Sequence, residues 1–222
     1  MKHQRRNKKT KQNRNKLVPL EAQTDNQKEY IRSIVENDIV ICSGPSGSGK
    51  SFVAAGIAAH HLHQGLVERI IVTRPLVCTG KEIGSLPGEL GEKIAPYLLP
   101  MKENLKHFLG QSFYGYHAND GAIQYKPLEI MRGSTFHDTY MILDEAQNCT
   151  IDQIKMFITR MGKNSKVLIN GDINQDDLRG RSGLDFCMNK LEGIEGVSIC
   201  KLGYEDIQRN DILGRVLNAL EN

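Results

Sequence analysis

Closely spaced cysteines, long apolar runs and a signal-type N-terminus are all missing from this 222-residue chain. Its five cysteines lie far apart without a Cys-x-x-Cys pair, which excludes the disulfide framework of a small secreted protein. No segment approaches the roughly 18 continuous apolar residues of a membrane span, and no apolar stretch follows the basic N-terminus. We therefore expect reduced thiols, a cytoplasmic location and no membrane partner.

Acidic residues are absent from residues 1–16, which carry eight basic side chains. Because the net charge of the whole chain is only +3, the remaining body carries an excess of acidic residues. A segment this basic cannot bury a core, so we expect a disordered basic tail at 1–18 and one folded domain at 19–222. The tail's charge suits a phosphate backbone, although a solvated tail without a partner has the same composition.

The folded part alternates strand-like and helix-like segments. A capping-box signature at Thr24 to Gln27 precedes the first helical pattern. Strands are expected at 39–42, 69–73, 140–143, 166–170 and 197–202, and helices at 51–64, 151–161, 183–192 and 211–221. The strands are almost wholly apolar, as parallel strands covered on both faces are. The pattern predicts an α/β fold with a doubly wound, mainly parallel sheet.

Residues 74–138 interrupt this alternation and are rich in Gly and Pro. Within them we expect one helix at 91–109 and one short strand at 123–125. The segment is interpreted as an insertion between core strands, where a partner-binding surface can lie. Its aromatic cluster, Phe113, Tyr114 and Tyr116, is either a loop platform on which bases stack or a set of rings used in core packing or an oligomer contact.

Residues 44–51 read Gly-Pro-Ser-Gly-Ser-Gly-Lys-Ser, a complete G-x-x-x-x-G-K-[ST] pattern between an expected strand and an expected helix. The glycines let successive N–H groups point at phosphate oxygens, and the helix N-terminus lies beneath them. A Gly-rich turn without a ligand is the alternative, but the context predicts a nucleotide-binding P-loop. Its expected contacts are Gly44, Pro45, Ser46, Gly47, Ser48, Gly49, Lys50, Ser51 and Phe52.

Two acids, Asp144 and Glu145, follow the expected strand 140–143. In P-loop enzymes an Asp at such a strand end holds Mg²⁺ together with the loop hydroxyl, here Ser51, while Lys50 reaches the β- and γ-phosphates. The adjacent Glu145 is then the candidate base that activates water. Two acids after a strand can instead begin a helix, where they complement its dipole.

Gln175 follows a further strand end, at 166–170, where α/β sheets bind ligands. It is a candidate γ-phosphate sensor, and Asp172 lies at the same edge. The alternative is an ordinary Asx-rich turn.

Further short motifs recur in a fixed order along the chain. They are Asn26-Gln27-x-x-Tyr30, the P-loop, Thr73-Arg74-Pro75, Gly84-x-Leu86-Pro87-Gly88, Met131-Arg132-Gly133, Leu143-Asp144-Glu145-Ala146-Gln147-Asn148, Thr159-Arg160-x-Gly162 and Gly171-Asp172-Ile173-x-Gln175. Together they resemble the PhoH family of bacterial and phage P-loop ATPases over residues 20–220.

The resemblance implies an additional-strand ATPase core similar to superfamily 1 helicases. It implies ATP and Mg²⁺ as cofactors, RNA or single-stranded nucleic acid as a partner, and a homohexameric ring. It also implies that Gln27 and Tyr30 approach adenine, although the capping box offers Gln27 a second role.

Hydrolysis of this kind also needs a cation on the γ-phosphate, often an arginine from a neighbouring subunit. Arg160 and Arg132 are the first candidates because they lie in motifs shared with the family. The other candidates are Arg74, Arg179, Arg181 and Arg209. The sequence departs from the family pattern at Ser134, where an arginine is common, and at Asn210, where a histidine is usual.

Three functions remain open at this stage. The leading hypothesis is a helicase-like ATPase that is coupled to RNA or single-stranded nucleic acid and forms a homo-oligomeric ring. The second is a nucleotide-gated scaffold that binds RNA or protein without unwinding. The third is a small-molecule kinase, which is disfavoured because no Arg-rich lid segment is visible that would exclude water.

Overall fold

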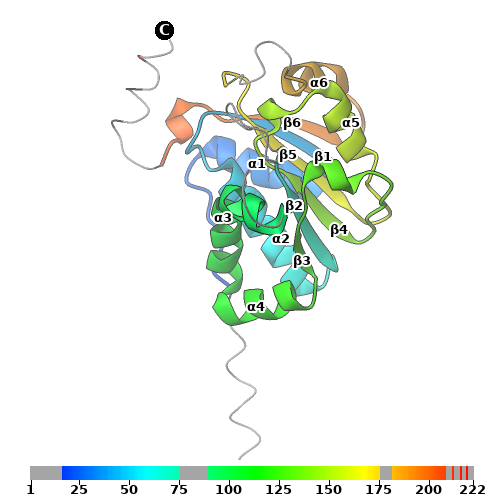
Figure 1. The fold of residues 1–222 in the computed structure, drawn as a ribbon. Helices are drawn as coiled ribbons and strands as arrows, with labels where there is room; N and C mark the ends of the chain where they lie inside the picture. The colour runs from blue at the N-terminus through cyan, green and yellow to red at the C-terminus, as the bar shows by residue number, and fades with distance from the viewer. Residues whose placement is uncertain are drawn as a thin grey trace, which may run out of the picture.

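The computed structural model describes residues 17–75, 90–175 and 182–208, together with residues 212, 216 and 219 (Figure 1). Six parallel strands form one sheet in the order β3-β2-β4-β5-β1-β6. The strands are β1 (Ile39–Ser43), β2 (Arg69–Thr73), β3 (Ile123–Tyr125), β4 (Thr139–Leu143), β5 (Lys166–Gly171) and β6 (Val197–Lys201). All five strands expected in the core, and the short strand of the insertion, are present.

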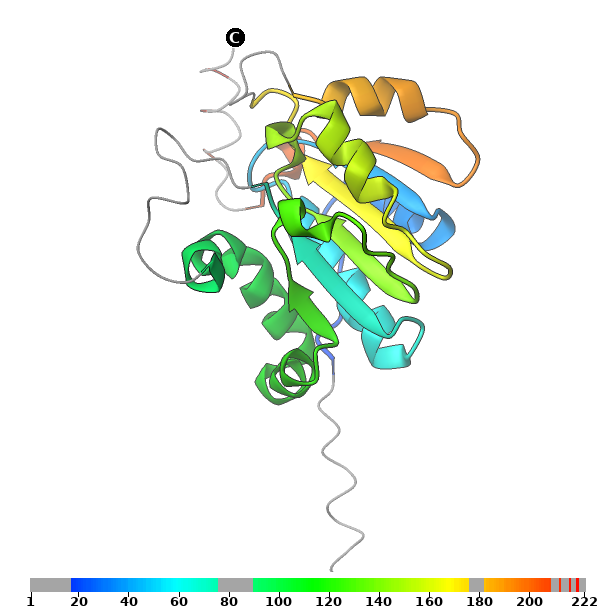
Figure 2. The same ribbon diagram turned by 45° about the vertical axis from the view of Figure 1, so that its right-hand side comes forward.

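Helices cover both faces of the sheet, as Figure 2 shows. The helices are α1 (Asp25–Glu36), α2 (Lys50–Gln64), α3 (Leu90–Leu109), α4 (Gln111–Asn119), α5 (Ile151–Ile158) and α6 (Leu184–Leu191), with single-turn 3₁₀ helices between them. One core lies between the sheet and helices α1 to α4, and a second lies between the sheet and α5 and α6. The doubly wound fold is therefore confirmed.

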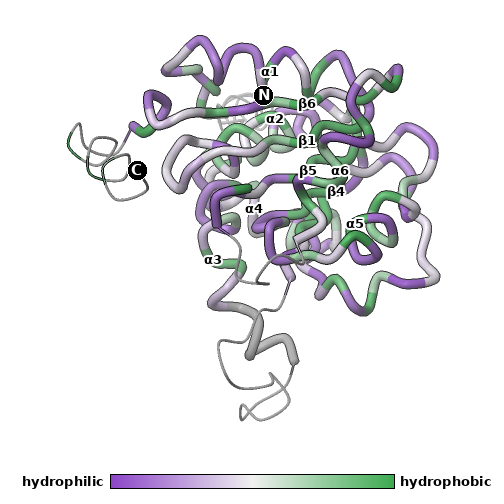
Figure 3. The backbone as a smooth tube through the Cα atoms, turned by 90° about the horizontal axis from the view of Figure 1, so that it is seen from above, coloured by the Kyte–Doolittle hydropathy of each residue, from purple (hydrophilic) through white to green (hydrophobic). Residues whose placement is uncertain are grey.

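The central strands are buried on both faces, which explains their uninterrupted apolar sequences. Every residue of β4 is buried, and Val167 to Gly171 of β5 are buried as well. In Figure 3 the outer helices alternate between hydrophilic and hydrophobic stretches, as helices with one buried face do. Strand β5 lies between β1 and β4, which is the additional strand that the family resemblance implies.

The insertion between β2 and β4 builds one edge of the molecule. Helix α3 packs against α2, and α4 follows it directly and packs beside β3 at the sheet edge. Helix α4 was not expected, because its sequence has a weak helical pattern. Tyr114 is buried on α4 while Tyr116 is 66% exposed, so the loop platform considered for these rings is wrong: they lie on a helix.

Several expectations fall on the margins of the described residues. Leu17 and Val18 pack against the core, and the Val18 N–H donates to the carbonyl of Phe108 at 3.1 Å. The folded domain therefore includes at least two residues that we had assigned to the tail. Outside the described residues lie residues 1–16, the Gly84 to Gly88 motif, Arg179, Arg181, Arg209 and most of the helix expected at 211–221.

Among the helices that the structure describes, none has the length and apolarity to cross a bilayer.

Candidate active site

The P-loop connects the end of β1 to the start of α2 along a path that two glycines permit. Gly44 passes so close to the residue that follows β6 that a Cβ there would lie 2.7 Å from the Leu202 carbonyl oxygen. Gly49, at the N-cap of α2, has a φ of 96°, in the left-handed region that favours glycine. The first N–H groups of α2 therefore face the loop, where an anion can accept from them.

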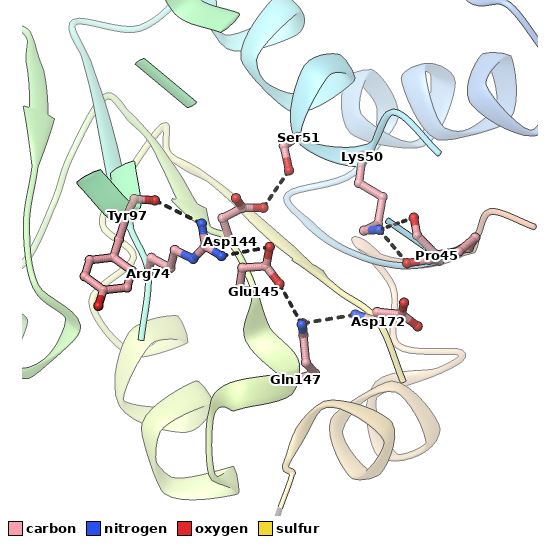
Figure 4. Close-up of polar contacts among 10 residues, drawn as sticks. Pro45, Lys50, Ser51, Arg74, Tyr97, Asp144, Glu145, Gln147 and Asp172 are labelled. Carbon is pink, nitrogen blue, oxygen red and sulfur yellow. Dashed lines mark hydrogen bonds and ion pairs between the residues drawn. The ribbon is translucent and has the colours of Figure 1, made fainter. Parts of the chain in front are cut away.

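Lys50 and Ser51, the first two residues of α2, carry the polar groups of the loop (Figure 4). The Lys50 Nζ donates to the carbonyl oxygens of Gly44 and Pro45, the latter at 2.9 Å, and so lies over the loop. The Ser51 Oγ donates to Asp144 Oδ1 at 2.7 Å. The loop hydroxyl and the first acid of the Asp-Glu pair, 93 positions apart in the sequence, thus meet at one point.

Asp144 directly follows β4, and its N–H donates to the Thr73 carbonyl at 3.0 Å. The residue is only 7% exposed. Burial raises the pKa of Asp144 above its usual value, and the charge of Glu145 adds to this effect. The Ser51 hydroxyl and the charges of Arg74 and Lys50 act in the opposite direction.

Glu145 has left-handed backbone angles, with φ of 58° and ψ of 41°, an uncommon conformation for this residue type. The turn separates the directions of the two acids, so that Asp144 faces Ser51 while Glu145 faces β2. Glu145 Oε1 lies 3.0 Å from Nη2 of Arg74, and Glu145 Oε2 accepts from the side-chain amide of Gln147 at 2.6 Å.

The end of β5 completes the site. The Gln147 Oε1 accepts from the backbone N–H of Asp172 at 3.1 Å, which ties the turn after β4 to the end of β5. Burial raises the pKa of Asp172. In the sequence, the only signal for a role of Gln147 is its place in the motif 143–148.

These groups surround one cleft of about 580 Å³. Its lining residues are Ser46, Gly47, Gly49, Lys50, Ser51, Phe52, Arg74, Pro100, Glu103, Asn104, Asp144, Glu145, Gly171, Asp172 and Gln175. Most of the P-loop, both acids and Gln175 are therefore brought together. Pro100, Glu103 and Asn104 come from α3, which sequence analysis had not connected with the site.

Gln27 and Tyr30 do not line this cleft. Gln27 is 5% exposed, and its Nε2 donates to the Ser48 carbonyl at 2.9 Å. Half of the expected capping box is present, because Thr24 Oγ1 accepts from the Gln27 N–H, whereas Gln27 Oε1 accepts from the N–H of Gln23. The Tyr30 hydroxyl donates to Asn170 at 2.6 Å.

The two arginines ranked first do not reach the cleft of their own chain. Arg160 donates to the carbonyl oxygens of Ser134 and Met156, at 3.2 and 3.3 Å, and Arg132 is exposed. Among the three candidate arginines that the structure describes, Arg74, Arg132 and Arg160, Arg74 is the one that lines the cleft. Its position directly after β2 was the available signal, because Thr73 is in register with Leu143 of β4.

The profile of the family described as "PhoH-like protein" matches residues 19–221. The chain belongs to the PhoH-like protein family. Because the fold carries a complete P-loop at the expected position, the PhoH-like chain is a P-loop nucleotide-binding protein.

Two relatives illustrate the match. The PhoH-like protein of Bacillus subtilis is 41% identical over 204 residues, which cover 91% of this chain and 64% of that protein. Protein PhoH of Escherichia coli K12 is 41% identical over 205 residues, covering 90% of this chain and 58% of that protein. The PhoH-like chain thus spans about three fifths of the length of these relatives.

Solved structures share the fold at low sequence identity. The large terminase of a thermophilic bacteriophage, in complex with ADP, has a TM-score of 0.55 and 10% identity over 88% of this chain and 49% of that chain. The UvsW helicase of bacteriophage T4 has a TM-score of 0.50 and 16% identity over 82% of this chain and 60% of that chain. These likenesses concern the fold of the PhoH-like chain.

Proposed function

We propose that this protein is a Mg²⁺-dependent ATPase whose turnover is coupled to RNA or single-stranded nucleic acid. The observation that carries the proposal is the meeting of Ser51 and Asp144 at 2.7 Å, with Lys50 and Glu145 lining the same cleft. The four groups come from two distant motifs and supply the functions that phosphoryl transfer to water requires.

The residues present fit a magnesium ion. A hydroxyl and a buried carboxylate in contact are hard oxygen ligands, which Mg²⁺ prefers, and the ion keeps several waters besides. Ser51 and Asp144 would hold it. Bound there, the ion would neutralise charge that develops on the β- and γ-phosphates.

The chain's own residues account for the remaining chemistry. Lys50 exchanges the Gly44 and Pro45 carbonyls for phosphate oxygens. Glu145 accepts a proton from a water whose oxygen attacks the γ-phosphorus, while the bond to the β–γ bridging oxygen breaks and ADP leaves. Gln175 also lines the cleft and would orient that water or the γ-phosphate.

Nucleic-acid coupling is supported by the basic residues 1–16 and by a fold that is similar to a helicase. A homohexameric ring would bring an arginine from a neighbouring subunit to the cleft, and Arg160 and Arg132, which do not reach their own cleft, are the candidates for that role. A cytoplasmic location belongs to the same proposal.

The first test is steady-state phosphate release with ATP and Mg²⁺, with and without single-stranded RNA. Wild type, Glu145→Gln and a variant lacking residues 1–16 would be compared. We expect stimulation by RNA, a fall in kcat of about 10²- to 10⁴-fold in Glu145→Gln, and weaker, less salt-dependent stimulation in the truncated variant. Wild-type protein that releases no phosphate contradicts the proposal, and release that is indifferent to RNA contradicts the coupling.

A second function is favoured by one observation. Helix α3, in the insertion 74–138, lines the nucleotide cleft, so bound nucleotide can order a surface there. The protein would then be a nucleotide-gated scaffold that binds RNA or protein. Unwinding of a tailed duplex only while ATP is hydrolysed would exclude this function. Phosphate release without any added acceptor would exclude an obligatory kinase.

A further inference from the structure

Arg74 joins the candidate base to a helix of the insertion. Its Nη2 lies 3.0 Å from Oε1 of Glu145, and its Nη1 donates to the Tyr97 carbonyl of α3 at 2.9 Å (Figure 4). The side chains of Arg74 and Glu145 are 24% and 35% exposed, so the ion pair is partly shielded from water. One guanidinium thus bridges the turn after β4 and helix α3.

The course of the backbone places both partners of Arg74, the Glu145 carboxylate and the Tyr97 carbonyl, within its reach. The left-handed conformation of Glu145 turns its side chain toward the end of β2, from which Arg74 projects. On the other side, α3 contains Pro100, which has no N–H for the helical ladder and whose ring pushes against the preceding turn. The carbonyl that Pro100 leaves without its helical donor is that of Pro96, and the carbonyl of the next residue, Tyr97, accepts from Arg74 at 2.9 Å.

Both oxygens of the candidate base have a partner. One oxygen of Glu145 contacts Arg74, and the other accepts from the Gln147 side-chain amide. Each carboxylate oxygen has two lone pairs, so each oxygen of Glu145 keeps one acceptor site beside its present partner. Loss of the Arg74 contact would leave both lone pairs of Oε1 available to an attacking water.

The charges of the cleft indicate which partner leaves. Its lining residues include four carboxylates, Glu103, Asp144, Glu145 and Asp172, against two cations, Lys50 and Arg74. A bound triphosphate adds further negative charge to this surplus and attracts both cations. Lys50 is already part of the loop, so the γ-phosphate competes with Glu145 for Arg74. The guanidinium is suited to the exchange because its fork matches a phosphate as well as a carboxylate.

We propose that Arg74 is a γ-phosphate sensor that leaves Glu145 when ATP binds, frees that carboxylate for water and releases the Tyr97 carbonyl of α3. The inference rests on the proposed function and adds a device within one chain that couples the γ-phosphate to the position of the insertion. ADP has no γ-phosphate and leaves the bridge intact. Whether ADP or ATP is bound would therefore determine whether Arg74 contacts α3.

Equilibrium binding of fluorescent ADP and of a non-hydrolysable ATP analogue, both with Mg²⁺, tests the sensor. We expect Arg74→Gln to raise the Kd of the analogue by about tenfold or more, since a charge-assisted contact to the γ-phosphate is lost. The Kd of ADP should change by less than about twofold. Glu145→Gln removes the competitor for Arg74 and should tighten the analogue alone. Arg74→Lys keeps the charge without the fork and should fall between wild type and Arg74→Gln.

Hydrogen exchange of the α3 amides supplies a readout that is independent of turnover. In wild type, the analogue should accelerate exchange at residues 98–104 more than ADP does, and in Arg74→Gln the two nucleotides should act alike. Arg32→Gln is the matched control, because Arg32 pairs with Glu29 on the exposed side of α1, outside the cleft. It should leave both affinities and the exchange pattern unchanged.

Equal effects of Arg74→Gln on ADP and on the analogue would overturn the sensor and leave the proposed function standing. If Arg74→Gln proves unstable, Glu145→Gln decides, because a change of one atom that fails to tighten the analogue also overturns it. Wild-type protein that binds neither nucleotide would overturn both the sensor and the proposed function.

Discussion

The side-chain amide of Gln147 donates to Glu145 Oε2 at 2.6 Å, within a turn of only three residues. The carbonyl oxygen of the same amide accepts from the Asp172 N–H at 3.1 Å, so Gln147 joins the carboxyl ends of β4 and β5. It is 2% exposed and does not line the cleft, which makes it a positioning residue for Glu145.

Gln147→Leu should lower kcat for ATP by about 10- to 100-fold, because small displacements of a catalytic group are costly, and should leave the KM for ATP within about twofold. Steady-state phosphate release over a range of ATP concentrations measures both constants. Gln124→Leu is the control, since that amide donates to Gly121 at the edge of the sheet and lies outside the cleft. A rise in KM of about 10- to 100-fold with no fall in kcat would contradict the positioning role.

Gly171→Ala should destabilise the fold by about 1–3 kcal/mol, because overpacking forces neighbours to move. An added Cβ would lie 2.5 Å from Leu184 Cδ2 and 2.9 Å from the backbone N and Oε1 of Gln147. Urea denaturation measures the loss. Gly115→Ala, within α4 and with nothing within 4 Å of the added atom, should be neutral or stabilising by up to about 1 kcal/mol. Equal stability of the two variants would refute the packing argument.

Asp144→Asn should stabilise the metal-free protein at pH 7 by about 0.5–2 kcal/mol and should abolish turnover. Such a trade-off between stability and activity is typical of active sites. Burial raises the pKa of Asp144, so the native state holds this proton more tightly than the unfolded chain does. The stability that this proton contributes is complete below the unfolded value near 3.8 and is lost as the pH rises through the native pKa.

The gain from Asp144→Asn should therefore shrink as the pH falls toward 4. Urea denaturation in a chelator at pH 7 and near pH 4 measures this trend. Glu195→Gln, at an exposed residue far from the cleft, is the control for loss of a carboxylate. A gain that is the same at both pH values would show that burial of the charge is not its cause.

Tyr30→Phe should cost about 1–3 kcal/mol of stability, the usual penalty for leaving a buried polar partner unsatisfied. Tyr30 and Asn170 are both fully buried, and the tyrosine hydroxyl donates to Asn170 Oδ1 at 2.6 Å while the Nδ2 of that asparagine has no partner. Tyr116→Phe, at a ring that is 66% exposed, should change stability by less than about 0.5 kcal/mol. Thermal and urea denaturation would measure both, and a Tyr30→Phe variant as stable as wild type would contradict the expected penalty.

The sequence alone determined the sheet and the positions of the P-loop and of the acidic pair at the ends of its central strands. Apolar runs such as 166–170 predict buried parallel strands because their burial on both faces leaves a local signature. The P-loop and the Asp144-Glu145 pair are equally local, since each depends on residues that are neighbours in the chain. Helix α4 was missed because it has no such local signature. Its own periodicity is weak, and its stability comes from packing against α3 and β3.

Only the tertiary structure decided which side chains share the cleft. Arg74 was one of six candidate arginines in the sequence, and it is placed against Glu145 by the parallel register of β2 and β4. Gln147 acquires its bridging role from the adjacent end of β5, and α3 reaches the cleft by packing on α2. Such relationships join residues that are distant in sequence, and the interactions that create them are those of the assembled core. Local pattern therefore located the groups that we propose to bind phosphate, and packing selected their partners.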